Sequence, residues 1–388
     1  MTLSIAHLAD AMDAIAPLAG AEPWDRVGLH VGRREDPLTG PALLTIDLTE
    51  QVMDEAVAMN AGAIVAYHPP IWTKLERVTD ATVTERIVHS AIRNGIAIYS
   101  PHTALDACEG GITDWLCEGI AGLAEGEKPG GRIAGDSRAL KPHAESDPNQ
   151  QVKIVTFVPS AQVGTVRGAL ATAGAGIIGG YSVCSFSSPG VGTFFGGEGT
   201  KPKVGQAGRL EEIEEVRLEM VCSKSALPLA IETLRNFHPY EEPAIDAFDV
   251  LPTPRRSRGA GRRLVLDQPA TLADIGRRLG DFLGHARMKV ALPADDRPVR
   301  SVGIVPGAGA DFVEIAQREG AEAFVTGEMK HHEVLAALHA GVGLLLAGHT
   351  NTERGYLPRL ADQLRAKVQG IDVRISEKDR DPLVLLRK

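Results

Sequence analysis

The sequence predicts an α/β fold in which one domain with a mostly parallel sheet is split by a smaller ferredoxin-like α+β insert. Short apolar runs alternate with amphipathic stretches near the start of the chain and again towards its end, which is typical of α/β layers. A segment rich in glycine, proline and charge ends the first alternation near residue 125. The pattern that follows, β-α-β-β-(β)-α-β, is typical of a ferredoxin-like unit.

The first half of the split domain begins with a helix over residues 4–18, because Ile5, Leu8, Met12 and Ile15 recur at helical spacing. Apolar runs and amphipathic stretches then alternate regularly. They predict strands at 42–48, 63–66 and 96–99 and helices at 50–60 and 82–94.

The middle of the chain changes character. Residues 126–150 carry no sustained periodicity and are expected to form a linker. The predicted insert, 151–252, contains strands at 152–158, 181–186, 192–195, 216–222 and 245–250 and helices at 161–173 and 226–236. A second linker is expected at 253–263.

The α/β alternation resumes after residue 264. Strands are predicted at 302–305, 323–326, 344–347 and 373–375, and helices at 311–318, 330–339 and 357–367. The simplest account is one α/β domain formed from residues 1–125 and 260–388.

Bulk composition limits the classes of function. The net charge of −9 argues against a general nucleic-acid binder, since phosphate contacts need a basic surface. The four cysteines have no CxxC spacing, so a reduced compartment is expected. The N-terminal residues have no signal-peptide pattern and no apolar run approaches ~20 residues, so we expect a cytoplasmic protein without a membrane span.

Four polar residues each follow a predicted strand: His68, Asp106, His349 and Glu353. Functional groups gather at the carboxyl ends of strands in open α/β sheets. Imidazole and carboxylate ligands together suit Zn²⁺, Fe²⁺ and Mn²⁺. His349 and Glu353 are four residues apart, which on a helix places both side chains on one face. A glutamate can also bridge two ions, so the pattern predicts a site for one or two divalent ions.

Each of these residues also has a simpler interpretation. His68 could be a satisfied loop residue, and Asp106 could cap a helix that begins near Gly111. His349 and Glu353 could be a surface pair. It is the joint pattern that favours a metal site.

Acid/base candidates follow another predicted strand. Glu328, His331 and His332 lie in TGEMKHHE, where they could act as catalytic groups or simply form the polar start of a helix. Further candidates for the surroundings of the site are His102, Asp25 and Asp47.

Five segments, taken in order, resemble the GTP cyclohydrolase one type two homolog family, also called NIF-three-like proteins. They are EPWDRVGLHVG at 22–32, YHPPIW at 67–72, PHTALD at 101–106, FVTGEMKHH at 324–332 and AGHTNTE at 347–353. The insert, with FHPYEEPAIDAFDV at 237–250, resembles the PII/CutA-like insert of the longer family members.

This resemblance implies a dinuclear metal centre and a toroidal homohexamer. His68, Asp106 and Glu353 would hold one ion, and His349 and Glu353 would serve the second. Where the bacterial pattern has a histidine, this chain has Tyr67, whose phenol is a poor neutral ligand with a pKa near ~10. Three roles stay open for Tyr67: a metal ligand, a hydrogen-bond partner of a metal-bound water, or a pocket wall.

Two functions follow from these observations. The first is a metal-dependent hydrolase of a small molecule. The alternative is a non-enzymatic metal-binding or regulatory scaffold whose insert binds a ligand or partner. An open metal site favours the hydrolase, whereas a closed site with all positions filled by protein favours the scaffold.

Overall fold

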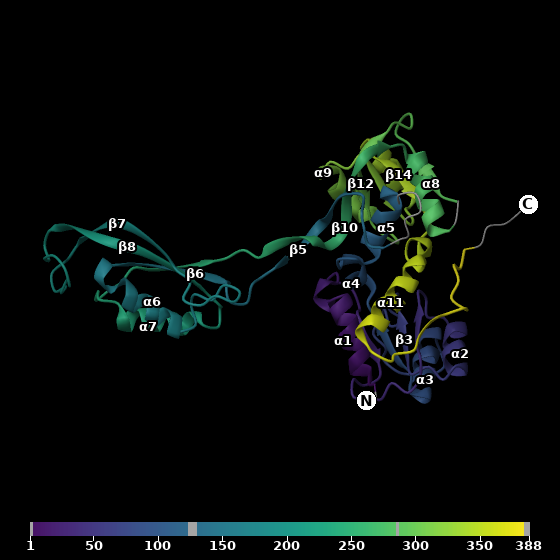
Figure 1. Cartoon of the computed structure of the whole chain (residues 1–388), viewed down its shortest axis with the longest axis horizontal. Coiled ribbons are helices and arrows are strands. Elements are labelled where there is room, and N and C mark those ends of the chain that lie inside the picture. Colours follow the sequence, from purple (N-terminus) through teal and green to yellow (C-terminus); the bar gives the residue numbers. More distant parts are fainter. Residues whose placement is uncertain (1–2, 123–129, 285–286, 384–388) are drawn as a thin grey trace, which may run out of the picture. The chain divides into compact units, whose positions relative to one another are not determined.

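The computed structural model describes residues 3–122, 130–284 and 287–383, and the chain forms two compact units (Figure 1). Unit 1 combines Met1–His143 with Arg255–Lys388, and unit 2 is Ala144–Pro254. No helix in the described part of the chain is both long and apolar enough to cross a bilayer.

The first sheet of unit 1 has five strands in the order β1-β4-β3-β2-β15. Its strands are β1 (Gly28–Val31), β2 (Ala42–Thr45), β3 (Ala63–Ala66), β4 (Ala97–Ser100) and β15 (Val373–Ile375). All neighbours are parallel except β1, which pairs antiparallel with β4 at the edge. The four-residue parallel strands are fully buried, which explains why they are continuous apolar runs.

The second sheet of unit 1 has six strands in the order β11-β14-β13-β12-β10-β5. Its strands are β5 (Gly135–Glu145), β10 (Thr253–Ala270), β11 (Lys289–Ala291), β12 (Val299–Ile304), β13 (Ala323–Thr326) and β14 (Gly343–Leu346). The central three are parallel, β10 runs antiparallel to β12, and β11 runs antiparallel to β14. The sequence predicts a single, mostly parallel sheet, and this is wrong: unit 1 has two sheets, each with parallel and antiparallel pairs.

Helices surround these sheets. They are α1 (Ile5–Ile15), α2 (Glu50–Ala58), α3 (Val83–Asn94), α4 (His102–Ala107), α5 (Ile112–Ala121), α8 (Leu272–Leu283), α9 (Val313–Arg318), α10 (His331–His339) and α11 (Leu357–Lys367). Local signals set their ends: Thr82 accepts a hydrogen bond from the Glu85 backbone N–H at the start of α3, and Gly95 ends it with φ 65°.

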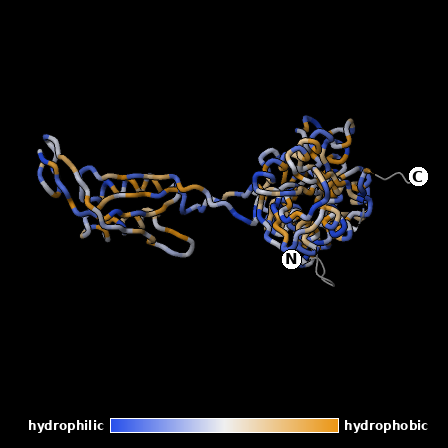
Figure 2. The backbone as a smooth tube through the Cα atoms, turned by 90° about the horizontal axis from the view of Figure 1, so that it is seen from above, coloured by the Kyte–Doolittle hydropathy of each residue, from blue (hydrophilic) through white to orange (hydrophobic). Residues whose placement is uncertain are grey.

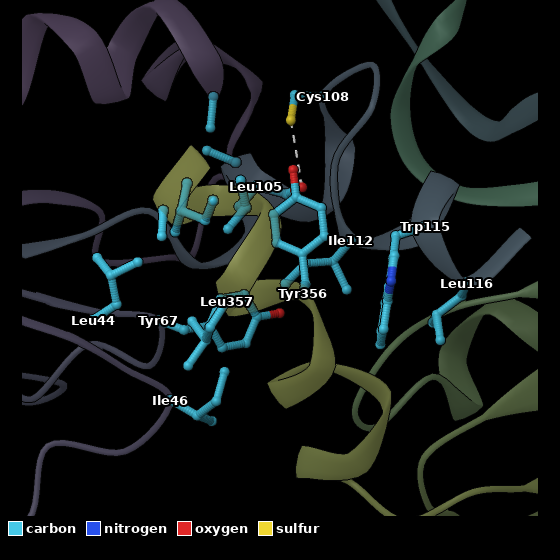
Figure 3. Close-up of a cluster of buried hydrophobic side chains, with 14 of the residues drawn as sticks. Leu44, Ile46, Tyr67, Leu105, Cys108, Ile112, Trp115, Leu116, Tyr356 and Leu357 are labelled. Carbon is cyan, nitrogen blue, oxygen red and sulfur yellow. Dashed lines mark hydrogen bonds between the residues drawn. The ribbon is translucent and has the colours of Figure 1, made fainter. Parts of the chain in front are cut away.

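One continuous core joins the two sheets of unit 1. It combines Leu44 and Val65 of the first sheet with Val302 and Val325 of the second. Side chains from α4, α5 and α11 fill the space between, and Figure 3 shows Tyr356 and Trp115 within this cluster. Because both sheets pack on one core, residues at the edges of both can contribute to one site.

Unit 2 has one antiparallel sheet in the order β7-β8-β6-β9, with two helices. Its elements are β6 (Val152–Val158), α6 (Val163–Thr172), β7 (Phe186–Phe195), β8 (Leu210–Cys222), α7 (Leu227–Phe237) and β9 (Ile245–Asp249). The predicted strands 181–186 and 192–195 are wrong as separate elements, because one strand, β7, covers Phe186–Phe195. In the second half of the neighbouring strand β8, Val216, Leu218 and Met220 alternate with Arg217 and Glu219. Figure 2 shows the hydropathy of each residue along the backbone of the chain.

Both predicted linkers contain strand residues where the structure describes them. Within 126–150, residues 135–145 form β5, and the predicted linker 253–263 lies inside β10. Residues 126–129 lie outside the described residues. Most of β5 and the first six residues of β10 are not buried, so neither segment carries the apolar alternation that reveals a strand.

Candidate metal centre

The two sheets of unit 1 each contribute to one cluster of side chains that could hold a metal ion. His68 follows β3, and His349 and Glu353 follow β14. One donor atom from each of these three residues lies within 4.8 Å of the others. The carboxyl ends of strands therefore meet here, as the sequence predicts.

His349 and Glu353 do not lie on an α-helix as predicted. Two short 3₁₀ turns, Thr350–Thr352 and Arg354–Tyr356, carry this segment. The Thr352 hydroxyl fixes the first turn, because it donates to the His349 carbonyl at 2.6 Å and accepts from the Gly307 N–H at 2.8 Å. The four-residue spacing still brings the two side chains together.

The Glu353 carboxylate lies between two imidazoles. Its Oε2 is 3.5 Å from His68 Nε2, and its Oε1 is 3.6 Å from His349 Nε2. These distances are too long for good hydrogen bonds. They are close to the ~3.4 Å that separates two ligands of one tetrahedral ion with metal–ligand bonds of ~2.1 Å. Each carboxylate oxygen thus forms a separate donor pair with one histidine.

Two further carboxylates orient the imidazoles. Asp47 Oδ1 lies 2.8 Å from His68 Nδ1, and Glu328 Oε1 lies 2.9 Å from His349 Nδ1. An ionised carboxylate only accepts hydrogen bonds, so each Nδ1–H donates to its carboxylate and the Nε2 of each ring faces Glu353. This carboxylate–histidine arrangement is the usual environment of metal-ligating histidines. Burial alone would raise the pKa of Asp47, but the hydrogen bond and charge of His68 lower it below its ordinary value.

Glu353 has the chemistry of a ligand that lacks its partner. Its side chain is 2% exposed, and Oε2 has no hydrogen-bond partner. Burial, together with the charges of Asp106 and Asp47, raises the pKa of Glu353 well above its ordinary value. An unpaired buried carboxylate is costly, and a divalent cation would compensate it. The donor set therefore fits a metal ion.

Asp106 lies on α4 and interacts with Tyr67. The Tyr67 hydroxyl donates a hydrogen bond of 2.7 Å to Asp106 Oδ1. Burial raises the pKa of Asp106 to about 6, although His102 and Tyr67 act in the opposite direction. Burial also raises the pKa of Tyr67 well above its ordinary value, and Asp106 adds to this effect. The phenol is thus a neutral donor to a predicted ligand.

His102 connects this region to Asp25. The Asp25 carboxylate accepts hydrogen bonds from His102 Nδ1 at 2.7 Å and from the Thr103 N–H at 3.0 Å. Burial would raise the pKa of Asp25, but His102 and Thr103 lower it overall. His102 has φ 30°, a left-handed conformation that is rare for a non-glycine residue. The Asp25 contacts hold it in that conformation, with its ring 5.5 Å from the ring of His68.

Of the three residues predicted to be catalytic, only Glu328 contacts a member of the cluster. Glu328 is about half exposed and contacts His349, so it orients a ligand. His331 and His332 are exposed in the first turn of α10.

Residues that the sequence did not indicate complete the surroundings. Arg354 donates to Asp379 at 2.5 Å and lies 3.9 Å from Asp47. Gly307, with φ 61°, approaches so closely that a Cβ there would lie 2.8 Å from Glu353 Oε1. Gly307 lies in the sequence PGAGAD at 306–311, a glycine-rich pattern that is nonspecific as a motif.

Fold and site together define a two-sheet α/β protein with a histidine–carboxylate cluster that could hold a divalent metal ion. The chain belongs to the Duf34/NIF3 (NGG1p interacting factor 3) family, whose sequence profile matches residues 3–382. This confirms the family predicted from the sequence.

Known relatives extend over nearly the whole chain. The GTP cyclohydrolase 1 type 2 homolog of Bacillus subtilis (strain 168) is 33% identical over 377 residues, which cover 96% of each chain. NIF3-like protein 1 of Homo sapiens is 31% identical over 392 residues, covering 98% of this chain and 92% of the human protein. A crystal structure of a Bacillus cereus protein related to NIF3 is similar over 100% of both chains, with a TM-score of 0.64 and 29% identity. These likenesses support the two-unit α/β architecture as a family property.

Proposed function

We propose that this protein is a divalent-metal-dependent hydrolase of a small molecule. The observation that carries the proposal is the buried Glu353 carboxylate, each of whose oxygens faces the Nε2 of a different carboxylate-oriented histidine. The name of the Bacillus subtilis relative, GTP cyclohydrolase 1 type 2 homolog, agrees with a hydrolytic reaction.

The donor set supports Zn²⁺, Fe²⁺ or Mn²⁺, which accept mixed imidazole and carboxylate ligands. His68, Asp106 and Glu353 would hold the first ion, and His349 and Glu353 the second. The two separate donor pairs of Glu353 support two positions. Tyr67 would complete the site through Asp106 rather than as a ligand, since its hydroxyl already donates to that carboxylate.

Solvent access supports catalysis over a closed structural site. The side chains of His68 and His349 are 24% and 34% exposed, so water and substrate can reach this edge. A bound ion supplies a hydroxide by lowering the pKa of its water. Glu328, next to His349 and in contact with solvent, would carry protons to and from the site. His331 and His332 would provide further acid/base groups from α10.

A hydrolysis screen tests this proposal. Metal content is measured first on the purified full chain by mass spectrometry, with anomalous scattering to count the ions. Metal-loaded wild type is then compared with Asp106→Ala and with Asp54→Ala, a control at an exposed position on α2. We expect hydrolysis in the wild type and the control only. Equal hydrolysis by Asp106→Ala would contradict the proposal.

A specific feature of unit 2 favours a second candidate, a metal-binding scaffold whose inserted unit receives a ligand or partner. We propose that this unit is ferredoxin-like and PII/CutA-like; its β-α-β-β-α-β order and the strand order β7-β8-β6-β9 support this. It contains a cavity of about 650 Å³, lined by residues that include Phe157, Arg217 and Tyr240. This cavity includes none of the metal-site residues described above. Ligand binding that survives loss of the metal would favour this candidate.

The homohexamer and the cytoplasmic location stay part of the proposal. Sedimentation of the metal-loaded chain tests the assembly. A mass of one or two chains would contradict a hexamer.

A further inference from the structure

Two tryptophans are exposed beside the metal centre. Trp24 is 56% exposed and Trp72 is 49% exposed, with ring centroids 5.8 Å apart. The third tryptophan of the chain, Trp115, is buried in the core. Large aromatic side chains contribute most to binding when they are desolvated, so half-exposed indoles side by side indicate a recognition surface.

Both tryptophans lie on segments that also carry site residues. Trp24 directly precedes Asp25, and Trp72 follows His68 by four residues, after Pro69 and Pro70. The prolines restrict the backbone between ligand and indole. The position of Trp72 is therefore tied to that of a metal-binding histidine.

His102 connects the tryptophans to the metal centre through ring contacts. Its ring centroid is 6.2 Å from that of Trp24 and 5.8 Å from that of Trp72, with interplanar angles of 74° and 81°. On its other side, His102 lies 5.5 Å from the ring of His68. A continuous series of aromatic rings thus leads from the surface to a predicted ligand.

These rings leave π-surface available. The two indoles are tilted by 56° and His102 meets both edge to face, so no ring covers another by parallel stacking. Exposed indole faces next to a site stack well on flat rings, and such stacking tolerates different bases because each has a π-face. A cationic ligand would also suit tryptophan, but a divalent ion close by would repel it.

We propose that Trp24 and Trp72 form an aromatic platform that binds the planar ring of the substrate and holds it next to His68. The substrate class is therefore a planar heterocyclic or aromatic compound. That the bound compound is a substrate rests on the proposed function, but binding of its ring can be measured without turnover.

Equilibrium dialysis of the metal-loaded full chain tests the platform, with guanosine, adenosine and uridine as probes and ribose as the matched compound without a base. We expect at least one nucleoside to bind and ribose not to bind. Trp72→Leu and Trp24→Leu should each weaken binding about tenfold, the effect of losing one stacked ring. Trp72→Phe, which keeps a ring, should stay close to the wild type.

Controls separate stacking from folding and from the metal site. Ile92→Ala removes a similarly exposed apolar side chain on α3 and should bind nucleoside like the wild type. Metal content should be unchanged in every tryptophan variant. Tetramethylammonium is a further probe for cation binding.

Several outcomes would overturn the platform: nucleosides that bind no better than ribose, a Trp72→Leu variant as tight as Trp72→Phe, or binding of tetramethylammonium alone. A change of oligomeric state in Trp72→Leu without a change in nucleoside affinity would assign the indoles to a contact between copies and also overturn it. Tryptophan-dependent binding without any hydrolysis would refute the hydrolase and leave ring binding standing. Hydrolysis that requires Asp106 but not the tryptophans would refute the platform alone.

Discussion

Replacing Asp106 with asparagine should stabilise the metal-free protein at neutral pH while it weakens metal binding. Burial raises the pKa of Asp106 from 3.8 to about 6. At 1.36 kcal/mol per pKa unit, keeping this carboxylate ionised in the folded state costs about 3 kcal/mol. Asparagine avoids that cost and still accepts the Tyr67 hydrogen bond, which becomes weaker by about 1 kcal/mol without the charge. The net gain is about 2 kcal/mol, which would raise Tm by roughly 4–6 °C.

The pH dependence has a definite sign. The folded state keeps a proton on Asp106 up to about pH 6, whereas the unfolded chain releases it near its ordinary value of 3.8. The folded state therefore binds more protons between these values, and stability falls as the pH rises from about 4 to about 6. Asp106→Asn should flatten this part of the profile, so the variant should gain over the wild type above pH 6 and not below pH 4.

Scanning calorimetry of chelator-treated protein between pH 4 and 8 measures this effect. Asp54→Asn, an exposed change on α2, serves as the control and should leave Tm unchanged. Added metal should then reverse the order of stability, because only the wild type retains the full ligand set. If Asp106→Asn lowers the Tm of the metal-free protein at pH 7, or shifts it equally at pH 4 and pH 7.5, the reasoning is wrong.

Three further substitutions probe the site and its support. Gly307→Ala should reduce metal affinity at least tenfold in titrations, because the new Cβ would lie 2.8 Å from Oε1 of the buried Glu353. The control is Gly95→Ala, which has a similar φ and nothing within 4 Å of the new Cβ, and it should leave metal affinity unchanged. Asp47→Asn should lower metal affinity about 10–100-fold, the usual cost of removing the group that orients a histidine ligand, with no comparable loss in urea stability. Arg262→Met should lower the free energy of urea unfolding by about 3–5 kcal/mol, because it leaves its buried partner Asp114 without a counter-charge. Arg277→Met, in the exposed pair with Asp274, should lower it by about 0–1 kcal/mol. Similar losses in both variants would contradict this reasoning.

The parallel strands were predictable because their burial leaves an unambiguous pattern. Ala42–Thr45 and Ala63–Ala66 are buried at every position, so each is an apolar run between amphipathic helices. The exposed strands were not predictable in this way. Residues 253–258 at the start of β10 are all exposed and include three arginines, so local sequence cannot distinguish them from a linker.

The number of sheets could not be predicted from the sequence, for a different reason. Alternating strands and helices specify parallel neighbours, but not where a sheet ends. The antiparallel strands β1 and β11 are only four and three residues long. Such short edge strands carry too little pattern to mark a second sheet.

The ligands of the candidate site were recognisable because each follows a strand, and that rule depends only on local order. The contacts around them depend on the tertiary fold. Arg354 meets Asp379, and Trp24 meets Trp72 across 48 positions, and no local periodicity reports such pairs. The i, i+4 spacing gave the right proximity for His349 and Glu353 through the wrong element, because two 3₁₀ turns replace the expected helix.

The position of the candidate site links metal binding to the stability of unit 1. His68 follows a strand of the first sheet, whereas His349 and Glu353 follow a strand of the second, so ions held by His68, His349 and the shared Glu353 would join the sheets across their common core. Without an ion, burial and neighbouring carboxylates oppose the ionisation of Glu353. A divalent cation would add positive charge beside Glu353 to that of Arg354, so metal binding and the stability of unit 1 should be linked. If Glu353 is a metal ligand as proposed, its buried Oε2, which has no hydrogen-bond partner, would bind the ion, and the ion would offset the cost of burying this carboxylate.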